Sequence, residues 1–368
     1  MNAPLQKMQI SSSMRILLSA ALLFFLSAGV VPSAWAQTTF VFDDTNTNCD
    51  DINFGTEHDF SDPDCWDDTG GNPLNAAPDA STHEVIINDG SRVVFDTQAN
   101  VTVASIFIGS TSEFAPETPA VTTLTISGAG GITNDGTFTG TTTIFDGGVA
   151  QTVGGTANVS LGNLEVTGSG TNVQLGDVDH FTGDVNVGAG ATLELVSGIG
   201  ELVNNGDLSV DGTLTTNGKP IRFGPTGVQT TISGASDPVV IDDFDTQRDL
   251  CLGTGLQIAS TSGEFRNGSS VTIDGDGSGG CSSESSGDLI LDGSVLFEGN
   301  ITSQGGGTLT ANGNLIIFNG GTSTAPQNIT GNPLSLGAVS VQNSSTLQPS
   351  VALTVNGDLS VNVGSTLD

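Results

Sequence analysis

The chain has 368 residues, with seven Lys or Arg against forty Asp or Glu, and a formal charge of −33. Nucleic acids and anionic membranes are bound by clustered basic side chains, so this balance argues against both as partners. Fifty-one glycines and no tyrosine make the composition unusual for a globular protein. The apolar residues nevertheless alternate with Thr, Ser and Asn, which indicates a folded all-β protein with many tight turns.

The first 36 residues have the pattern of a cleaved export signal. Lys7 and Arg15 precede the apolar run 16–31, and Ala34-Trp35-Ala36 places small residues around a cleavage site. The run is shorter than the roughly 20 residues of a membrane-spanning helix, which favours cleavage over a membrane anchor. We therefore expect an extracellular or cell-surface chain that starts at Gln37 and has no transmembrane segment. Its five basic and forty acidic residues give a formal balance of −35.

Four cysteines follow the export signal, and disulfides are the default in the oxidising environment of an exported protein. Four cysteines allow three connectivities, and the sequence alone does not choose among them. Proximity favours Cys49 with Cys65, within an acidic segment, 37–83, that we expect to cap the fold. It also favours Cys251 with Cys281, around an insertion near 251–281. A zinc site is disfavoured, because the cysteines lack CxxC spacing and a nearby histidine.

A five-residue motif recurs in the remaining segment, 84–368. It consists of Gly, then Asp or Asn, then Leu or Val, then any residue and an aliphatic residue. Copies begin at Gly162, Gly183, Gly206, Gly287, Gly313 and Gly357. The steps between them are 21, 23, 81, 26 and 44 residues. Apart from the 81-residue step and the slightly long 26, these are one or two units of about 22 residues, a period typical of solenoids.

Each copy reads as a corner followed by a short strand. Gly provides the positive φ or the close approach that a corner needs, and Asp or Asn supports the turn. The alternation that follows points apolar side chains inward and a polar one outward. A Thr-Leu pattern a few residues later reads as the next strand, at Thr192-Leu193, Thr213-Leu214, Thr308-Leu309 and Thr366-Leu367.

One such coil cannot bury its own apolar face, so successive coils must stack in parallel. We predict an all-β, right-handed parallel β-helix over 84–368, with coils of about 22 residues. The competing architecture is a string of antiparallel β-sandwich modules, which usually have longer strands and more aromatic core residues. In the β-helix, one shared interior should hold Leu164, Val185, Leu208, Leu289, Leu315 and Leu359.

A longer similarity spans several coils and indicates duplication. The stretch 144–148 (IFDGG) leads to Gln151, and the stretch 317–321 (IFNGG) leads to Gln327. A degenerate copy between them runs through Gln229.

These patterns resemble the repeat regions of secreted bacterial surface proteins and adhesin-like β-helix proteins over about residues 120–368. Residues 65–109 are similar to the G8-type domain of extracellular proteins, through Cys65-Trp66, the stretch 78–86 and Ile87-Asn88-Asp89-Gly90. The resemblance implies display at the cell surface. Partners would be host or neighbouring-cell surfaces, glycans or matrix.

Two loops carry the oxygen ligands that Ca²⁺ prefers, and calcium is the only cofactor we expect. The first offers ligands at alternate positions, namely Asp44, Asn46, Asn48 and Asp50. The second begins like an EF-hand loop, with Asp274, Asp276, Ser278 and Glu284. Its closing Glu falls one position early and no helical pattern flanks it, so an irregular calcium turn is the alternative to a solvated loop.

A polysaccharide-cleaving β-helix enzyme is the alternative function. It requires converging carboxylates, or carboxylates with a basic residue, beside aromatic sugar platforms. The best cluster is Asp242, Asp243 and Asp245, with Arg222 and Arg248 near in sequence. After residue 36 the chain has one tryptophan, and its three histidines stand apart in sequence. We therefore assign no catalytic residue and predict a non-enzymatic structural or adhesive rod.

Overall fold

The structure is a computed structural model. It describes residues 37–45, 49, 57–95, 100–116, 123–196, 198, 200–224, 230–235, 239–241, 243–246, 250–252, 256–258, 265–267, 271–274, 288–291, 295–297, 299–304, 308–310, 315–320 and 326–368. Among these residues, the only regular element that is not a β-strand is a short 3-10 helix, η1 (Pro63–Cys65). None of the described helical residues forms a helix long and apolar enough to cross a membrane. The predicted export signal, 1–36, lies outside the described residues.

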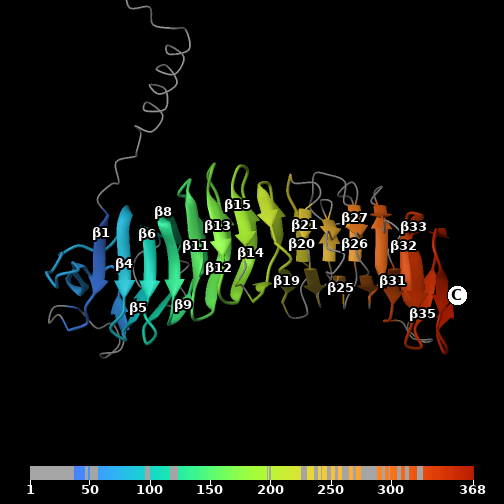
Figure 1. Cartoon of the computed structure of the whole chain (residues 1–368), viewed down its shortest axis with the longest axis horizontal. Coiled ribbons are helices and arrows are strands. Elements are labelled where there is room, and N and C mark those ends of the chain that lie inside the picture. The colour runs from blue at the N-terminus through green and yellow to red at the C-terminus, as the bar shows by residue number, and fades with distance from the viewer. Residues whose placement is uncertain are drawn as a thin grey trace, which may run out of the picture. The chain divides into compact units, whose positions relative to one another are not determined.

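The strands stack in three columns, and the labelled strands follow one another in chain order along the stack (Figure 1). Pairings between described strands are parallel except for that of β1 (Thr38–Phe42) with the short β3 (Trp66–Asp67), which is antiparallel. The chain visits the first, second and third columns in turn and then begins the next coil. Several long strands turn a corner and contribute to two columns, so columns merge into one 32-stranded sheet beside a six-stranded sheet.

The first column contains β2 (Glu57–Asp59), β5 (Arg92–Phe95), β7 (Glu113–Pro116), β9 (Thr137–Thr139), β12 (Val159–Val166), β14 (His180–Val187), β16 (Leu202–Asn204), β19 (Pro220–Phe223), β22 (Asp243–Thr246), β25 (Phe265–Asn267), β28 (Val295–Phe297), β31 (Leu315–Phe318), β34 (Ala338–Val341) and β37 (Leu359–Val361). The second contains the other parts of β12 and β14, parts of the long strands β6 and β8, and β10 (Thr142–Phe145), β17 (Leu208–Val210), β20 (Thr230–Ser233), β23 (Leu250–Leu252), β26 (Val271–Asp274), β29 (Ile301–Gln304), β32 (Gln327–Gly331), β35 (Thr346–Pro349) and β38 (Thr366–Leu367).

The third column begins with β1 (Thr38–Phe42), β4 (Ala80–Ile87), β6 (Asn100–Ile108), β8 (Thr123–Asn134), β11 (Ala150–Gly155), β13 (Asn172–Leu175), β15 (Thr192–Leu195) and β18 (Thr213–Thr215). It continues as β21 (Val239–Ile241), β24 (Leu256–Ile258), β27 (Asp288–Leu291), β30 (Thr308–Thr310), β33 (Leu334–Leu336) and β36 (Leu353–Val355). Because β1 pairs with β4 and β2 with β5, the segment 37–83 also contributes strands to the stack.

The register of the second column gives the length of one coil. From Thr123 to Ile232, paired residues lie between 19 positions apart, at Thr123 and Thr142, and 24 apart, at Leu208 and Ile232. Leu164 pairs with Val185 at an offset of 21. These offsets confirm the predicted parallel β-solenoid with coils of about 22 residues.

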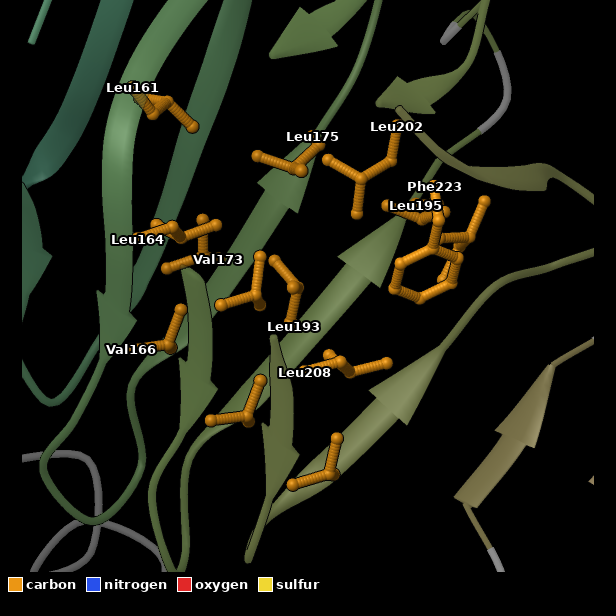
Figure 2. Packing of buried hydrophobic residues seen from close by; sticks show 14 of the residues in the cluster. Leu161, Leu164, Val166, Val173, Leu175, Leu193, Leu195, Leu202, Leu208 and Phe223 are labelled. Atoms are coloured by element: carbon orange, nitrogen blue, oxygen red, sulfur yellow. The ribbon is translucent and has the colours of Figure 1, made fainter. Parts of the chain in front are cut away.

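The apolar side chains of successive coils point toward one another and fill the interior, as Figure 2 shows around Leu164, Leu193 and Leu208. Alternation within each strand produces this arrangement: every second side chain of β13 and β15 is buried. Four of the predicted interior residues are at most 1 % exposed, namely Leu164, Val185, Leu208 and Leu289.

The prediction was wrong for Leu315 and incomplete for Leu359. In β31, Ile316 and Phe318 are buried and Leu315 is only half-buried, so the inward alternation starts one residue later than the motif suggests. Leu359 pairs with Val339 and therefore continues the inward ladder, yet it is 50 % exposed because it lies in the last coil.

The copies of the motif also do not share one column. Leu164, Val185 and Leu208 lie in the second column, Leu289 in the third and Leu359 in the first. The motif therefore marks a strand that follows a tight corner, whichever face that strand belongs to.

A ladder of Asn and Asp side chains explains the first two positions of the motif. The backbone N–H of Asp184 donates to Asn163 Oδ1 (3.1 Å), and that of Asp207 donates to Asp184 Oδ1 (2.9 Å). A Cβ added to Gly183 would collide with Asn163 Oδ1. In the same way, a Cβ added to Gly206 in the next coil would collide with Asp184 Oδ1. Close approach, more than positive φ, thus requires glycine at these two corners.

The duplicated stretches form the same buried corner in two places. Gln151 Nε2 donates to the carbonyls of Ile126 (2.7 Å) and Gly128 (2.8 Å) in the preceding coil. Gln327 Nε2 makes the equivalent pair of bonds, to the carbonyls of Phe297 (3.1 Å) and Gly299. Both glutamines are buried, and in each case the side-chain amide finds backbone carbonyl acceptors in the preceding coil.

Candidate functional site

The described part of the N-terminal segment 37–83, called the cap below, buries several aromatic side chains at the start of the stack. Phe42, Phe60 and Trp66 are almost fully buried, and the Trp66 ring meets both phenylalanine rings edge-on at centroid distances of 5.1–5.2 Å. Trp66 Nε1 donates to the carbonyl of Phe60 (3.0 Å), which satisfies the indole N–H. The aromatic residues of the cap therefore extend the hydrophobic core of the coils, and the Phe60 ring meets the Phe114 ring edge-on.

A disulfide between Cys49 and Cys65 closes the cap, as the sequence predicted, with the two Cα atoms 4.7 Å apart. His58 lies beside it, with Nδ1 3.5 Å from Cys49 Sγ and its ring 5.3 Å from that of Phe42. One ligand atom from each of Cys49, His58 and Cys65 falls within 4.8 Å of the others. From the sequence, His58 stands apart from the other histidines, but it lies between the two cysteines, which is a signal for this cluster.

Two carboxylates meet next to this cluster. Asp43 Oδ1 accepts from the hydroxyl (2.6 Å) and the backbone N–H (2.9 Å) of Thr45, and the hydroxyl bond is the main reason that the Asp43 pKa is lowered. Asp67 is 6 % exposed, and its Oδ1 has no hydrogen-bond partner. Burial raises the pKa of Asp67, and the neighbouring charge of Asp43 raises it further.

The predicted calcium loops fall largely outside the described residues. Asp44 is exposed, and its backbone N–H donates to Asp89 Oδ2 (3.2 Å), but Asn46, Asn48 and Asp50 are not described. Asp274 ends β26 and pairs with Gln304. Its predicted co-ligands lie outside the described residues, namely Asp276, Ser278 and Glu284. The Cys251–Cys281 bridge also stays a prediction, because Cys281 is not described.

Two of the three carboxylates predicted for an enzyme site, Asp243 and Asp245, belong to β22 in the first column. Arg222 pairs in register with Asp245, and Asp245 pairs with Arg266, which places opposite charges at successive positions of neighbouring strands. The guanidinium of Arg222 forms an ion pair with Glu201 (3.1 Å). The register thus forms a ladder of charged positions along the first column. Asp242 and Arg248 lie outside the described residues.

His180 is a buried ionisable side chain in the middle coils. It continues a ladder between Val159 and Leu202, is fully buried, and has Nε2 3.2 Å from the carbonyl of Gly176. Its Nδ1 has no hydrogen-bond partner. Burial lowers the pKa of His180 to about 4, outweighing the upward effects of the Gly176 carbonyl and of nearby carboxylates, so the ring is neutral at pH 7.

Comparison with known proteins found no protein-family model that matches the chain, and no curated protein or solved structure that matches it.

Proposed function

We propose that the chain is a secreted, non-enzymatic β-solenoid that serves as a structural or adhesive protein at the surface of a bacterial cell. Two features support the proposal: the export pattern of residues 1–36, and the repeated coils that form the stack. Its partners would be host or neighbouring-cell surfaces, glycans or matrix.

The observation that carries the proposal is the periodic polar exterior. Glu165, Asn186 and Ser209 occupy the same outward position on three successive coils, while their neighbours Leu164, Val185 and Leu208 fill the interior. Parallel stacking repeats such positions about every 4.8 Å. A surface that presents one polar position many times suits multivalent contact with a repetitive glycan or matrix, because many weak contacts add up to strong attachment.

Export can be tested by expressing the full chain in a bacterial host and comparing it with a variant that lacks residues 1–36. We expect the full chain outside the cytoplasm, with an N-terminus at Gln37 by mass spectrometry, and the truncated variant in the cytoplasm. A full chain that stays cytoplasmic with residues 1–36 attached contradicts the proposal.

Adhesion can be tested with beads coated with the mature chain and passed over arrays of glycans and matrix proteins. The control is beads that carry an unrelated protein of matched negative charge. We expect selective retention of the solenoid beads on a repetitive polymer. Equal retention of both bead types on every surface indicates charge alone and contradicts an adhesive role.

Calcium binding is a separate part of the proposal. We expect millimolar Ca²⁺ to raise the melting temperature by site binding, which saturates, whereas screening of carboxylate repulsion responds to Na⁺ at matched ionic strength. Replacing Asp274 and Asp276 with Asn should remove most of the calcium-specific part. If Na⁺ reproduces the whole shift, or the double substitution leaves it unchanged, the second loop binds no calcium.

The alternative, a carbohydrate-active enzyme, is favoured by one observation: the first column places Asp245 between two arginine positions. The two functions predict different effects of substitution. If the ladder is catalytic, Asp245→Asn abolishes cleavage of a susceptible polysaccharide and leaves the melting temperature almost unchanged. If it is structural, as we propose, no polysaccharide in a broad panel is cleaved and the substitution lowers the melting temperature.

A further inference from the structure

We propose that, once the Cys49–Cys65 bond is reduced, the two thiolates and the His58 imidazole bind one zinc-class divalent ion in the cap. The basis is the convergence of three ligand atoms within 4.8 Å, from side chains that the sequence separates by up to 16 positions. His58 and Cys65 are buried and Cys49 is half-buried, so the site is sheltered and open on the Cys49 side. The inference is independent of the function proposed above.

The donor set determines the class of ion. Two thiolate sulfurs and one imidazole nitrogen favour zinc and related ions over calcium or magnesium, which prefer oxygen. With Zn–S bonds of about 2.3 Å and tetrahedral angles, the two sulfurs must lie about 3.8 Å apart. The sulfurs therefore have to separate by roughly 2 Å after reduction, a movement that a change of cysteine side-chain torsion can supply. Water fills the fourth position.

The ligands are held by packing that does not depend on the disulfide. His58 lies in β2, where it pairs with Val93 of β5, and its ring packs against Phe42. Cys65 is followed by Trp66, whose indole is buried and hydrogen-bonded, and β3 pairs with β1. We therefore expect the cap to keep its fold after reduction of the disulfide, with the three ligands close enough to bind one ion.

The chemistry exchanges one cross-link for another. A dithiol reductant gives two electrons and two protons to the Cys49–Cys65 bond, forming two thiols while the reductant becomes a disulfide. The metal then displaces both thiol protons and accepts a lone pair from the imidazole, so binding weakens on acidification. Both cross-links close the segment from residue 49 to 65, and they exclude each other because the same sulfurs form both.

The test uses the full mature chain with Cys251→Ser and Cys281→Ser, so that only the cap carries cysteines. The protein is kept reduced without oxygen and titrated with Co²⁺ in the presence of excess Ca²⁺, which occupies surface carboxylates. We expect one equivalent of Co²⁺ with a thiolate-to-cobalt absorption band, displaced by Zn²⁺. The oxidised protein should show no band.

Variants identify the ligands. Replacing Cys49 and Cys65 together with Ser should abolish the band, and His58→Gln should weaken Co²⁺ binding at least about tenfold. His83→Gln is the matched control, because the His83 ring packs on Phe40, elsewhere in the cap, and should leave binding unchanged. The fluorescence of Trp66, the only tryptophan after residue 36, reports whether the reduced cap stays folded or is refolded by Zn²⁺.

Several outcomes overturn the proposal. One is a reduced protein that shows no thiolate band with Co²⁺, whether Trp66 reports a folded cap or a cap that Zn²⁺ fails to restore. Another is a His58→Gln variant that binds Co²⁺ as tightly as its parent. Binding that survives replacement of both Cys49 and Cys65 with Ser shows that the thiolates do not hold the ion, which also contradicts the site.

Discussion

The first and last coils have the same alternating strands but differ in what covers them. At the N-terminal end, the cap buries Phe42, Phe60 and Trp66 and closes with a disulfide. In the last coil, Leu359 is 50 % exposed although its register continues the interior ladder. The alternation of apolar residues therefore fixes which way a side chain points, and burial also requires a neighbour on both sides of the coil.

Inward side chains that are covered on both sides should contribute most to the stability of the fold. An inward side chain between two coils contributes the full transfer and packing free energy, whereas one with a single neighbour contributes only part. Substitutions in the cap should accordingly cost much more than similar substitutions in the last coil.

Phe60→Ala should destabilise the cap by about 3–5 kcal/mol, because it opens a cavity between the Trp66 and Phe114 rings. The matched change in the last coil, Leu359→Ala, should cost about 1 kcal/mol or less. Urea unfolding followed by Trp66 fluorescence and by circular dichroism measures both. Equal losses of unfolding free energy in the two variants would show that covering by the cap does not increase the contribution of a buried side chain.

Replacing Cys49 and Cys65 together with Ala should destabilise the cap by about 3 kcal/mol, since the bond closes a segment of 16 residues. The loss should shift the Trp66 transition to lower urea concentration and leave the unfolding of the later coils, followed by circular dichroism, nearly unchanged. A shift of both transitions by the same amount instead means that the cap and the stack unfold as one unit.

His180→Leu should remove a pH-dependent term from the unfolding free energy of the middle coils. The folded pKa of about 4 lies below the unfolded value near 6.5, so the unfolded state binds more protons between these pH values. Stability from neutral His180 is complete above pH 6.5 and falls by up to about 3 kcal/mol as the pH drops toward 4. The difference in unfolding free energy between wild type and variant should therefore change with pH over this window. A constant difference contradicts the buried neutral ring.

Gly200→Ala should cost about 1–2 kcal/mol, because a Cβ at this corner meets the carboxylate oxygen of Asp179 in the preceding coil. Asp179→Ala alone should cost about 1 kcal/mol, through loss of the bond from the Glu201 N–H (3.1 Å). Because one side chain causes both effects, the double variant should be less destabilised than the sum of the single variants. Strict additivity in thermal unfolding argues against the corner ladder.

Much of the fold was predictable because short-range chemistry determines it. The step of about 22 residues and the inward alternation at Leu164 and Val185 follow from strand geometry and stacking. The pairing of Cys49 with Cys65 followed from proximity. The one-residue error at Leu315 arose because the inward register depends on where each corner ends, and corner length varies from coil to coil.

The candidate site was harder to predict, because it depends on contacts between strands. The position of His58 between two cysteines is a signal in the sequence, but strand pairing is what brings its ring beside Cys49. No sequence signal predicts that Asp67 is buried next to Asp43. Likewise, the motif copies at Leu208 and Leu289 look equivalent in sequence yet belong to different columns, because the motif marks a strand after a tight corner on any face.

Engineered disulfides between outward positions test the parallel stacking of coils most directly. Parallel register pairs Thr142 with Asn163 and Ile144 with Glu165. Cα atoms of paired residues on neighbouring strands lie within disulfide range, whereas crossed pairs lie farther apart. Under oxidation, we predict efficient cross-linking of the two cysteine double variants at paired positions, mapped by mass spectrometry, and little at the crossed positions, Thr142 with Glu165 and Ile144 with Asn163. Cross-linking of the crossed pairs instead of the paired ones indicates antiparallel hairpins and contradicts the solenoid.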